Sequence, residues 1–262
     1  MQKLVDGYIF FHKKLDYGVW NNEVWAPLEV GAAYHNEQLM EDGFRDDIGD
    51  NISIWNPLFL ENTGTYWIWK HHTDAKYIAQ CQYRRRLNFQ DPQDIDNIMA
   101  NKMVITTKPL VFLGQTVRQQ YERCHNEEDI KMAEAAVKFL YPDYSASWDK
   151  YINNGNRLYY SNGFIFRTED YDRYAEWLFN ILFTMQAEMG FKTPDEHRLW
   201  IENEMALGKR PNNNGKGGTE GATYYQGEFF AFLSERLFTL YILHNFTQDQ
   251  IFEAPYLKYE NV

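Results

Sequence analysis

Residues 7–11 read Gly7-Tyr8-Ile9-Phe10-Phe11, and His12-Lys13-Lys14 follows directly. A compact run of aromatic and β-branched residues is typical of a buried strand. In open α/β sheets, ligands bind at the carboxyl ends of the strands. His12 and Lys13 are therefore expected to lie where a phosphate group can bind. A solvated loop explains the same residues equally well.

A second strand is predicted over residues 77–81, and it leads directly into Gln82-Tyr83-Arg84-Arg85-Arg86. Guanidinium groups are permanently charged and match the geometry of phosphate oxygens. On an extended run, Arg84 and Arg86 share one face and Arg85 points to the other. We expect a diphosphate site here. The alternative is a surface role in solubility or ion pairing.

Residues 31–56 contain many turn formers and lack a helical or strand period. They include the acidic run Arg45-Asp46-Asp47-Ile48-Gly49-Asp50-Asn51-Ile52-Ser53. We expect an irregular loop, whose carboxylates are the natural partners of the arginine run if those arginines form ion pairs. Asn51 fits a contact with sugar hydroxyls or a nucleotide, and equally a turn. Asn162, in Asn162-Gly163, has the same two interpretations.

Strands and helices alternate over the first 170 residues, and helices dominate afterwards. This order predicts one α/β domain over residues 1–262, with a mostly parallel sheet and a helix-rich C-terminal part. We place the nucleotide-binding part at about residues 1–115 and the helix-rich part at about 116–262. Beyond the two strands above, the expected elements are strands at 103–106, 157–160 and 164–166, and helices at 56–72, 116–125, 126–140, 168–190, 193–208 and 228–244.

The composition narrows the class of protein. The chain has 262 residues, 44% hydrophobic and 24% charged, which suffices for a packed core. Its net charge of −11 provides no global field for nucleic acid or anionic lipid. Two cysteines exclude a disulfide scaffold. The 17% aromatic content fits a bulky core or rings that stack on sugars and bases.

No segment approaches the roughly 20 apolar residues of a membrane span, and no signal peptide is visible. We therefore expect a cytoplasmic protein, with peripheral membrane contact left open. The chain lacks the phosphate-binding loop of kinases, the dinucleotide glycine motif and the serine-hydrolase elbow. Asp94-Ile95-Asp96 is a D-x-D, but it lies in a polar stretch rather than at a strand end, so a surface role is favoured over metal binding. The glycine-rich loop at 208–221 is either a surface loop or a lid.

Several segments together resemble the bacterial capsular and exopolysaccharide glycosyltransferase family long catalogued only as a domain of unknown function. In order, they are FFHKK (10–14), RDDIGDNIS (45–53), NPLFLENTGTYWIWKH (56–71), YIAQCQYRRRLNF (77–89), QQYERCH (119–125), YYSNGFIF (159–166), EWLFNILF (176–183) and FFAFLSERLF (229–238). The family usually has histidine where this chain has Gln82. It also tends to a Leu-Thr-Ala-like run where this chain has Asn62-Thr63-Gly64.

The resemblance implies a GT-A-like, Rossmann-related fold. It also implies transfer of a hexosyl unit, galactofuranosyl in some relatives, from a nucleotide sugar to a growing capsular, exopolysaccharide or lipid-linked glycan. UDP is the expected nucleotide. A lipid-linked acceptor would place the enzyme at the inner membrane face.

The chemistry of such a transfer assigns roles to individual residues. A carboxylate must deprotonate the acceptor hydroxyl in an inverting enzyme, and Glu235 is the first candidate and Asp47 the second. An ion pair with Arg236 is the structural alternative for Glu235. Cations must stabilise the leaving diphosphate, and we expect Arg84 and Arg85, with Lys13, to do so in place of a metal. Magnesium or manganese on the nucleotide sugar is the alternative.

The other residues expected to bind the nucleotide sugar are His12, Asp46, Asn51, Asn162 and Arg236. Two rival functions remain open at this point. A non-catalytic carbohydrate-binding or assembly subunit would use the aromatic rings. A glycoside hydrolase would use a pair of carboxylates from Asp46, Asp47, Glu61 or Glu235. Only the transferase needs the arginine run, because the rivals bind no diphosphate.

Overall fold

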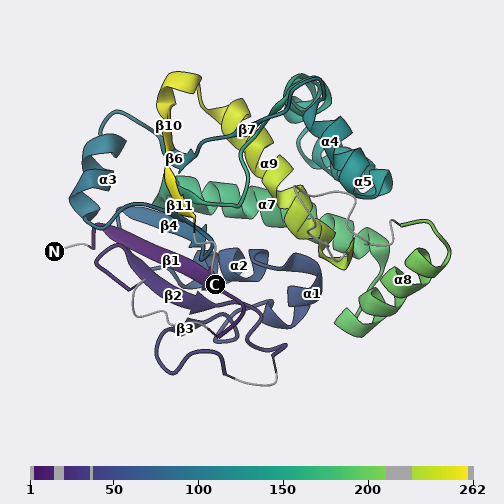
Figure 1. Cartoon of the computed structure of the whole chain (residues 1–262), viewed down its shortest axis with the longest axis horizontal. Coiled ribbons are helices and arrows are strands. Elements are labelled where there is room, and N and C mark those ends of the chain that lie inside the picture. Colours follow the sequence, from purple (N-terminus) through teal and green to yellow (C-terminus); the bar gives the residue numbers. More distant parts are fainter. Residues whose placement is uncertain (1–2, 15–20, 36–37, 211–225, 259–262) are drawn as a thin grey trace.

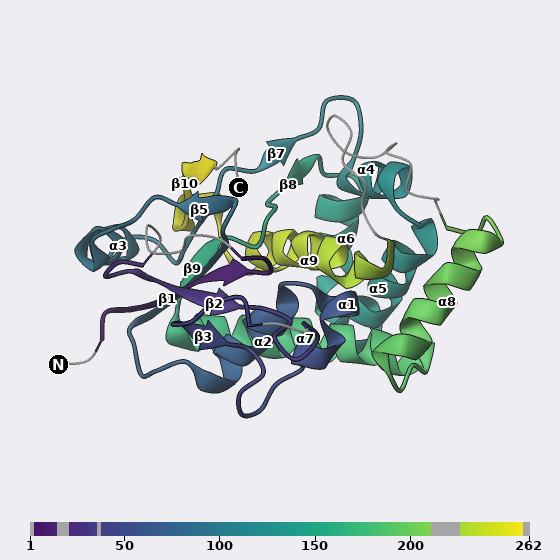
Figure 2. The same cartoon turned by 60° about the horizontal axis from the view of Figure 1, so that its bottom comes forward.

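The computed structural model describes residues 3–14, 21–35, 38–210 and 226–258 (Figure 1). Most of the predicted loop at 208–221 lies outside these residues. The described chain is a mixed α/β structure with a mostly parallel central sheet, as predicted. Helices α3 and α8 lie at opposite ends of the molecule, and α7 and α9 run beside the sheet (Figures 1 and 2).

The main sheet has the strand order β10-β6-β9-β4-β1-β2-β3. Strand β1 is parallel to both β2 and β4, whereas β9 is antiparallel to β4 and β6. The strands are β1 Val5–Phe11, β2 Trp25–Glu29, β3 Phe44–Arg45, β4 Tyr77–Gln82, β5 Arg85–Leu87, β6 Val104–Thr107, β7 Leu110–Val111, β8 Arg157–Leu158, β9 Phe164–Arg167, β10 Ile251–Ala254 and β11 Tyr256–Lys258. The antiparallel β9 puts its first residue at the same edge as the carboxyl ends of β4 and β6.

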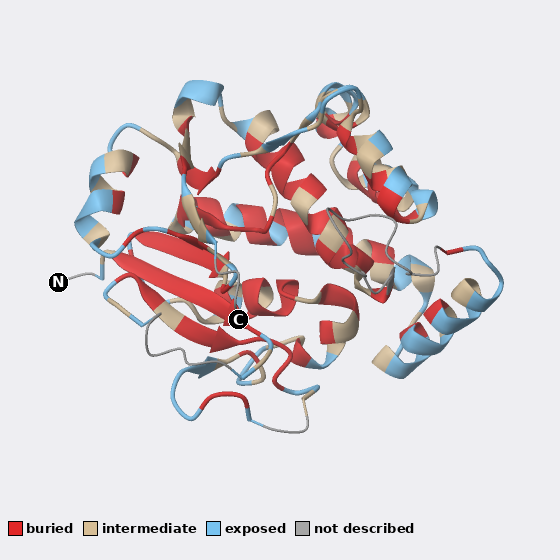
Figure 3. Ribbon diagram, in the orientation of Figure 1, coloured by how far each residue is buried: buried red, intermediate tan, exposed pale blue. Residues whose placement is uncertain are grey.

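Alternate side chains of β1 enter two separate cores, as the period of a strand requires. Tyr8 and Phe10 join the larger core with α2, α5, α7 and α9, whereas Ile9 and Phe11 join the smaller core with α3. The strands of the sheet are buried along most of their length (Figure 3). Gly64 of α2 packs on β1, where an added Cβ would lie 2.8 Å from a ring carbon of Phe10.

The described helices are α1 Asn56–Phe59, α2 Asn62–His71, α3 Pro92–Met99, α4 Val117–Cys124, α5 Glu127–Leu140, α6 Ser145–Trp148, α7 Thr168–Met189, α8 Pro194–Ala206 and α9 Phe229–Asn245. The predicted side-chain caps begin α4, α5 and α8, whereas α3 and α6 were not predicted. Thr116 forms a capping box with Gln119, and the Asn126 side chain accepts from the amide of Glu128. Gly190 ends α7 with a φ of 73°.

Three expectations about local structure are wrong. The helix predicted over 56–72 is two helices, because Leu60 has a φ of 48° and interrupts it. The arginine run is not extended, because the chain turns back at Tyr83 and Arg84 and Gln82 pairs with Arg85. Strands β2, β3, β10 and β11 were not predicted.

Candidate active site

One edge of the sheet collects the carboxyl ends of the parallel strands and the turn that precedes β9. His12 follows β1, Gln82 ends β4 and Thr107 ends β6. The turn before β9 lies against them, because a Cβ added at Gly163 would be 3.5 Å from Thr107 Cγ2 and 3.7 Å from Cys81 Cβ. This is the edge at which an open α/β sheet binds its ligands.

A basic cluster surrounds the ring of Tyr83 at this edge. The ring of His12 packs edge-on against it with centroids 5.2 Å apart. Lys13 Nζ and Arg84 Cζ lie 5.6 Å and 5.3 Å from the ring centroid. The turn exposes Arg84, while Arg86 on the returning strand is buried. Arg84 and Arg86 therefore do not share a face, and Arg84 is the arginine that reaches solvent here.

Burial keeps His12 uncharged, and these cations add to the effect. Removal of the ring from water by the surrounding protein lowers the pKa of His12 to about 4, and the charges of Arg84 and Lys13 contribute to this shift. Part of the residue remains exposed to solvent. No ion pair joins Lys13, Arg84 or Arg85 to any carboxylate of the described residues. The acidic loop is thus not the partner of the arginine run.

Arg85 lies beside an aromatic pair that links this edge to the end of the chain. Its Cζ is 5.0 Å from the centroid of the Tyr160 ring, and the Tyr160 and Tyr256 hydroxyls are hydrogen-bonded at 2.5 Å. Burial raises the pKa of Tyr160, on which the charges of both Arg85 and Glu235 also act. Tyr160 therefore contacts Arg85 and feels the charge of Glu235.

A group of carboxylates stands next to the basic cluster. Glu61 accepts hydrogen bonds from Gln82 Nε2 at 2.8 Å and from Asn162 Nδ2 at 3.1 Å. Burial and the neighbouring charge of Glu235 raise the pKa of Glu61 to about 7. Burial and Glu61 likewise raise the pKa of Glu228 to about 7. A carboxyl group that titrates near neutrality suits acid–base chemistry.

Glu235, on α9, is held at both oxygens. Its Oε1 accepts from the amide of Ser161 at 2.7 Å, and its Oε2 pairs with Arg236 Nη1 at 3.0 Å. The guanidinium of Arg236 is 4% exposed and also donates to Phe232 O and Gln120 Oε1. Arg236 thus contacts Glu235 from inside the protein, and the predicted ion pair is present.

The acidic run holds the loop after β2 in place. Asp46 is fully buried and accepts four hydrogen bonds, from the amides of Gly31 and Ala32 and the hydroxyls of Ser53 and Thr63. Gly31 has a φ of 72°, and a Cβ added there would lie 2.5 Å from the Asn56 side chain. Asp46 therefore holds the loop after β2 in shape. Both of its carboxylate oxygens already accept hydrogen bonds from the protein.

Asp47 and Asn51 lie in the same loop. Asp47 receives Arg45 Nε at 3.2 Å and Nη2 at 2.9 Å, in a partly exposed ion pair. Asn51 donates to the carbonyls of Asp47 and Gly49 and accepts from the amide of Ser53. Asn51 thus performs the turn role that was one of its two predicted roles.

The D-x-D motif lies away from the site. Asp96 is on α3 and accepts from Lys76 Nζ at 2.5 Å and from the Tyr77 hydroxyl at 2.7 Å, at the start of β4 rather than its carboxyl end. Across residues 3–14, 21–35, 38–210 and 226–258, no three His, Cys, Asp or Glu side chains are arranged to hold a metal ion. Asp96, the second carboxylate of the D-x-D, therefore accepts its hydrogen bonds at the opposite end of β4 from the site edge.

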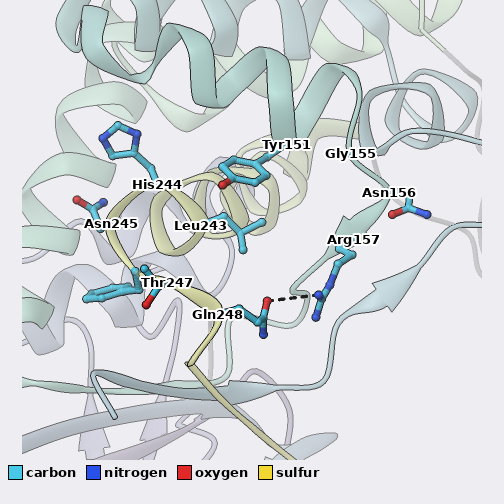
Figure 4. A pocket seen from close by; sticks show the side chains of 10 residues that line it. Tyr151, Gly155, Asn156, Arg157, Leu243, His244, Asn245, Thr247 and Gln248 are labelled. Atoms are coloured by element: carbon cyan, nitrogen blue, oxygen red, sulfur yellow. Dashed lines mark hydrogen bonds between the residues drawn. The ribbon is translucent and has the colours of Figure 1, made fainter. Parts of the chain in front are cut away.

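A cavity of about 570 Å³ lies elsewhere, at the C-terminal end of α9 (Figure 4). Tyr151 and Leu243 are among its lining residues, and Arg157 Nη1 donates to Gln248 Oε1 at 3.3 Å. None of the predicted site residues lines it. In the described part of the chain, no helix is both long and apolar enough to cross a membrane.

The sequence predicts that His12, Lys13, Arg84 and Arg85 lie at one edge of the sheet, and the structure places them there. The carboxylates were predicted less completely. Glu61 was considered only as a catalytic carboxylate of a hydrolase, and Glu228 was not a predicted site residue. The aromatic pair was also missed, since Tyr256 comes from an unpredicted strand. No local signal pointed to Glu61, because the helix break at Leu60 that directly precedes it was not predicted.

Comparisons with known proteins agree with this description. The family described as "Domain of unknown function (DUF4422)" matches residues 7–200. A solved structure described as the apo form of the bifunctional glycosyltransferase WbbM has the same fold, with a TM-score of 0.75 and 23% sequence identity. The match covers 98% of this chain and 46% of that one, so this chain spans about half the length of the solved protein. No curated protein sequence matches.

Proposed function

The chain belongs to the DUF4422 family, and from the geometry of its site we propose that it is a glycosyltransferase, which moves a hexosyl unit from a nucleotide sugar to a glycan. The observation that carries the proposal is the pairing of two groups at one sheet edge. Lys13, Arg84 and Arg85 have no carboxylate partner in the described structure, and Glu61 accepts a hydrogen bond from Gln82, two residues before Arg84. The charge of Glu235 acts on Glu61, and the charge of Glu61 acts on Glu228. The fold shared with a bifunctional glycosyltransferase supports the same class of reaction.

Glycosyl transfer needs both of these groups. The leaving diphosphate develops negative charge, and cations in fixed positions stabilise it. Lys13 Nζ and Arg84 Cζ lie 5.6 Å and 5.3 Å from the centre of the same Tyr83 ring, so both charges can act on a diphosphate bound there. The neutral imidazole of His12 adds a hydrogen-bonding group without adding charge. UDP is the nucleotide we propose, on the resemblance of the motifs alone.

The acceptor hydroxyl must lose a proton to a carboxylate. We assign this step to Glu235, because Arg236 and the amide of Ser161 hold its carboxylate in one orientation. The proton passes from the acceptor oxygen to Glu235 as the oxygen attacks the anomeric carbon and the bond to the diphosphate breaks. Asp47 is the second candidate, and its carboxylate is likewise held by an arginine, Arg45. Arg236 acts on the reaction through Glu235.

The cations take the place that a metal ion holds in many enzymes of this fold class. Asp94 and Asp96, on α3, lie near the start of β4, away from the carboxyl end where the diphosphate is proposed to bind. The acceptor we propose is a growing glycan carried on a lipid, which follows from the family resemblance. For contacts with the hydroxyls of the acceptor we propose Asn162, which follows the Ser161 that contacts Glu235, and the Tyr160–Tyr256 pair.

Thermal denaturation with a panel of UDP-, GDP- and CMP-compounds tests the class of protein. Stabilisation by a nucleoside diphosphate supports the transferase, whereas stabilisation by free glycans alone would indicate a binding module. Mass spectrometry of products from candidate nucleotide sugars and a lipid-carrier acceptor then identifies the sugar. A chain that binds no nucleotide and transfers no sugar contradicts the proposal.

A further inference from the structure

Backbone strain in this protein converges on one carboxylate. Leu60, Ser161 and Asn162 are the non-glycine residues with positive φ in the described chain, at 48°, 66° and 47°. Such conformations are costly for residues with a Cβ and persist where the surroundings enforce them. Leu60 directly precedes Glu61, and the Asn162 side chain donates to it. Two of the three strained residues therefore border Glu61, and the third, Ser161, directly precedes Asn162.

Glu61 joins three elements that are distant in sequence. The break at Leu60 turns its side chain inward, where Glu61 is 6% exposed. Its Oε1 receives Gln82 at the end of β4 and Asn162 in the turn before β9. The same Asn162 amide nitrogen donates to Ser234 Oγ on α9 at 2.9 Å. Removing the carboxylate would leave buried amide donors without an acceptor, which is unfavourable.

The turn that Glu61 holds is the turn that holds Glu235. Gln80 Nε2 donates to the carbonyl of Asn162 at 3.1 Å and fixes the turn from β4. One residue earlier, the amide of Ser161 donates to Glu235 Oε1 at 2.7 Å. The left-handed φ of Ser161 is part of what points this amide toward α9. A continuous chain of contacts thus runs from Glu61 through the turn to Glu235.

We propose that Glu61 is a positioning residue, which holds the Ser161–Asn162 turn in its left-handed form so that the amide of Ser161 orients Glu235. The contact between Glu61 and the turn stands on the structure alone, whereas its effect on catalysis rests on the proposed function. The position calls for an acceptor oxygen rather than a charge. Glu228 and Glu235 act on Glu61 as like charges, and no described cation pairs with it.

This distinction between acceptor and charge makes the proposal testable. Glu61→Gln keeps an acceptor oxygen for Gln82 and Asn162 and removes the charge. Glu61→Ala removes both. Asn162→Gly tolerates the positive φ and loses only the side chain. Asp6→Asn is a matched control, because Asp6 is also a buried carboxylate with hydrogen bonds from Tyr8 and Thr73.

Two measurements are made on each variant and on the double variant of Glu61→Ala with Asn162→Gly. Amide hydrogen exchange at Ser161 reports the turn without any substrate. We expect at least about tenfold faster exchange in Glu61→Ala and Asn162→Gly, and near-normal exchange in Glu61→Gln and Asp6→Asn. In transfer assays kcat falls about tenfold with an unchanged Kd for the nucleotide, and the double variant loses no more than either single variant.

Unchanged Ser161 exchange in Glu61→Ala overturns the proposal, and so does a Glu61→Gln variant that exchanges as fast as Glu61→Ala. Strictly multiplicative losses of kcat in the double variant also overturn it. A wild-type chain that transfers no sugar contradicts the proposed function instead. The exchange measurement still decides the role of Glu61 in that case, because it needs no substrate.

Discussion

Replacing Asp46 with alanine removes the group on which the loop after β2 depends. Its carboxylate is fully buried and receives Gly31 N at 2.8 Å, Ala32 N at 3.0 Å, Thr63 Oγ1 at 2.6 Å and the hydroxyl of Ser53. No other carboxylate in the acidic run accepts as many. The alanine variant leaves four donors in the protein without their acceptor.

The expected loss follows from these four contacts. A hydrogen bond to a charged group contributes about 1.5–3 kcal/mol, but water that enters the vacated space recovers part of the total. We therefore expect the free energy of unfolding to fall by about 4 kcal/mol. For a chain of this size that loss lowers Tm by about 10 °C.

Asp47→Ala is the matched control, because Asp47 is the next residue in the same loop. Its ion pair with Arg45 is partly exposed, with side-chain exposures of 27% and 23%, and such pairs contribute less than about 1 kcal/mol. Urea denaturation followed by tryptophan fluorescence measures both variants. If Asp46→Ala unfolds within 1 kcal/mol of Asp47→Ala, the four hydrogen bonds do not hold the loop and this reasoning is refuted.

Three further predictions concern pH and catalysis. Burial, and then the charge of Arg210, lower the pKa of His197 to about 4. The free energy of unfolding should therefore fall as the pH drops from about 6.5 through 4, because the folded state resists protonation of the ring. In urea denaturation, His197→Leu should remove up to about 3 kcal/mol of this pH dependence. Glu235→Gln should lower kcat by about 10²–10⁴-fold with an unchanged nucleotide Kd, and a larger loss in Asp47→Asn would transfer the role of base to Asp47. Transfer activity should survive exhaustive chelation, and activity restored only by manganese or magnesium would show that the cations do not replace a metal.

The sequence predicted those elements whose signals are local. Strands β1 and β4 are continuous apolar runs, and α4 and α5 begin at capping residues that form the expected hydrogen bonds. Strand β2 was missed because Pro27 interrupts a short run that already sits among turn formers. The hairpin at Tyr83 was missed because its turn contains no glycine or asparagine to indicate it.

The site was predicted less completely, because burial and pairing depend on segments that meet only in the fold. The sequence of the arginine run is typical of an extension of the preceding strand. The pairing of β5 with β4 and β11, which the sequence does not indicate, determines which arginine is most exposed. The donors to Asp46 come from three separate segments. Glu61 becomes prominent only when the turn before β9 is seen to bind it.

Titration calorimetry of UDP against the wild-type chain and Arg84→Met tests the central claim most directly. Arg198→Met is the control, because Arg198 is a partly exposed arginine on α8, far from the sheet edge (Figure 1). The account predicts that Arg84→Met weakens binding by about tenfold or more, and that Arg198→Met leaves it unchanged. Equal affinity in all three chains, or no binding of any nucleoside diphosphate to the wild type, would contradict it.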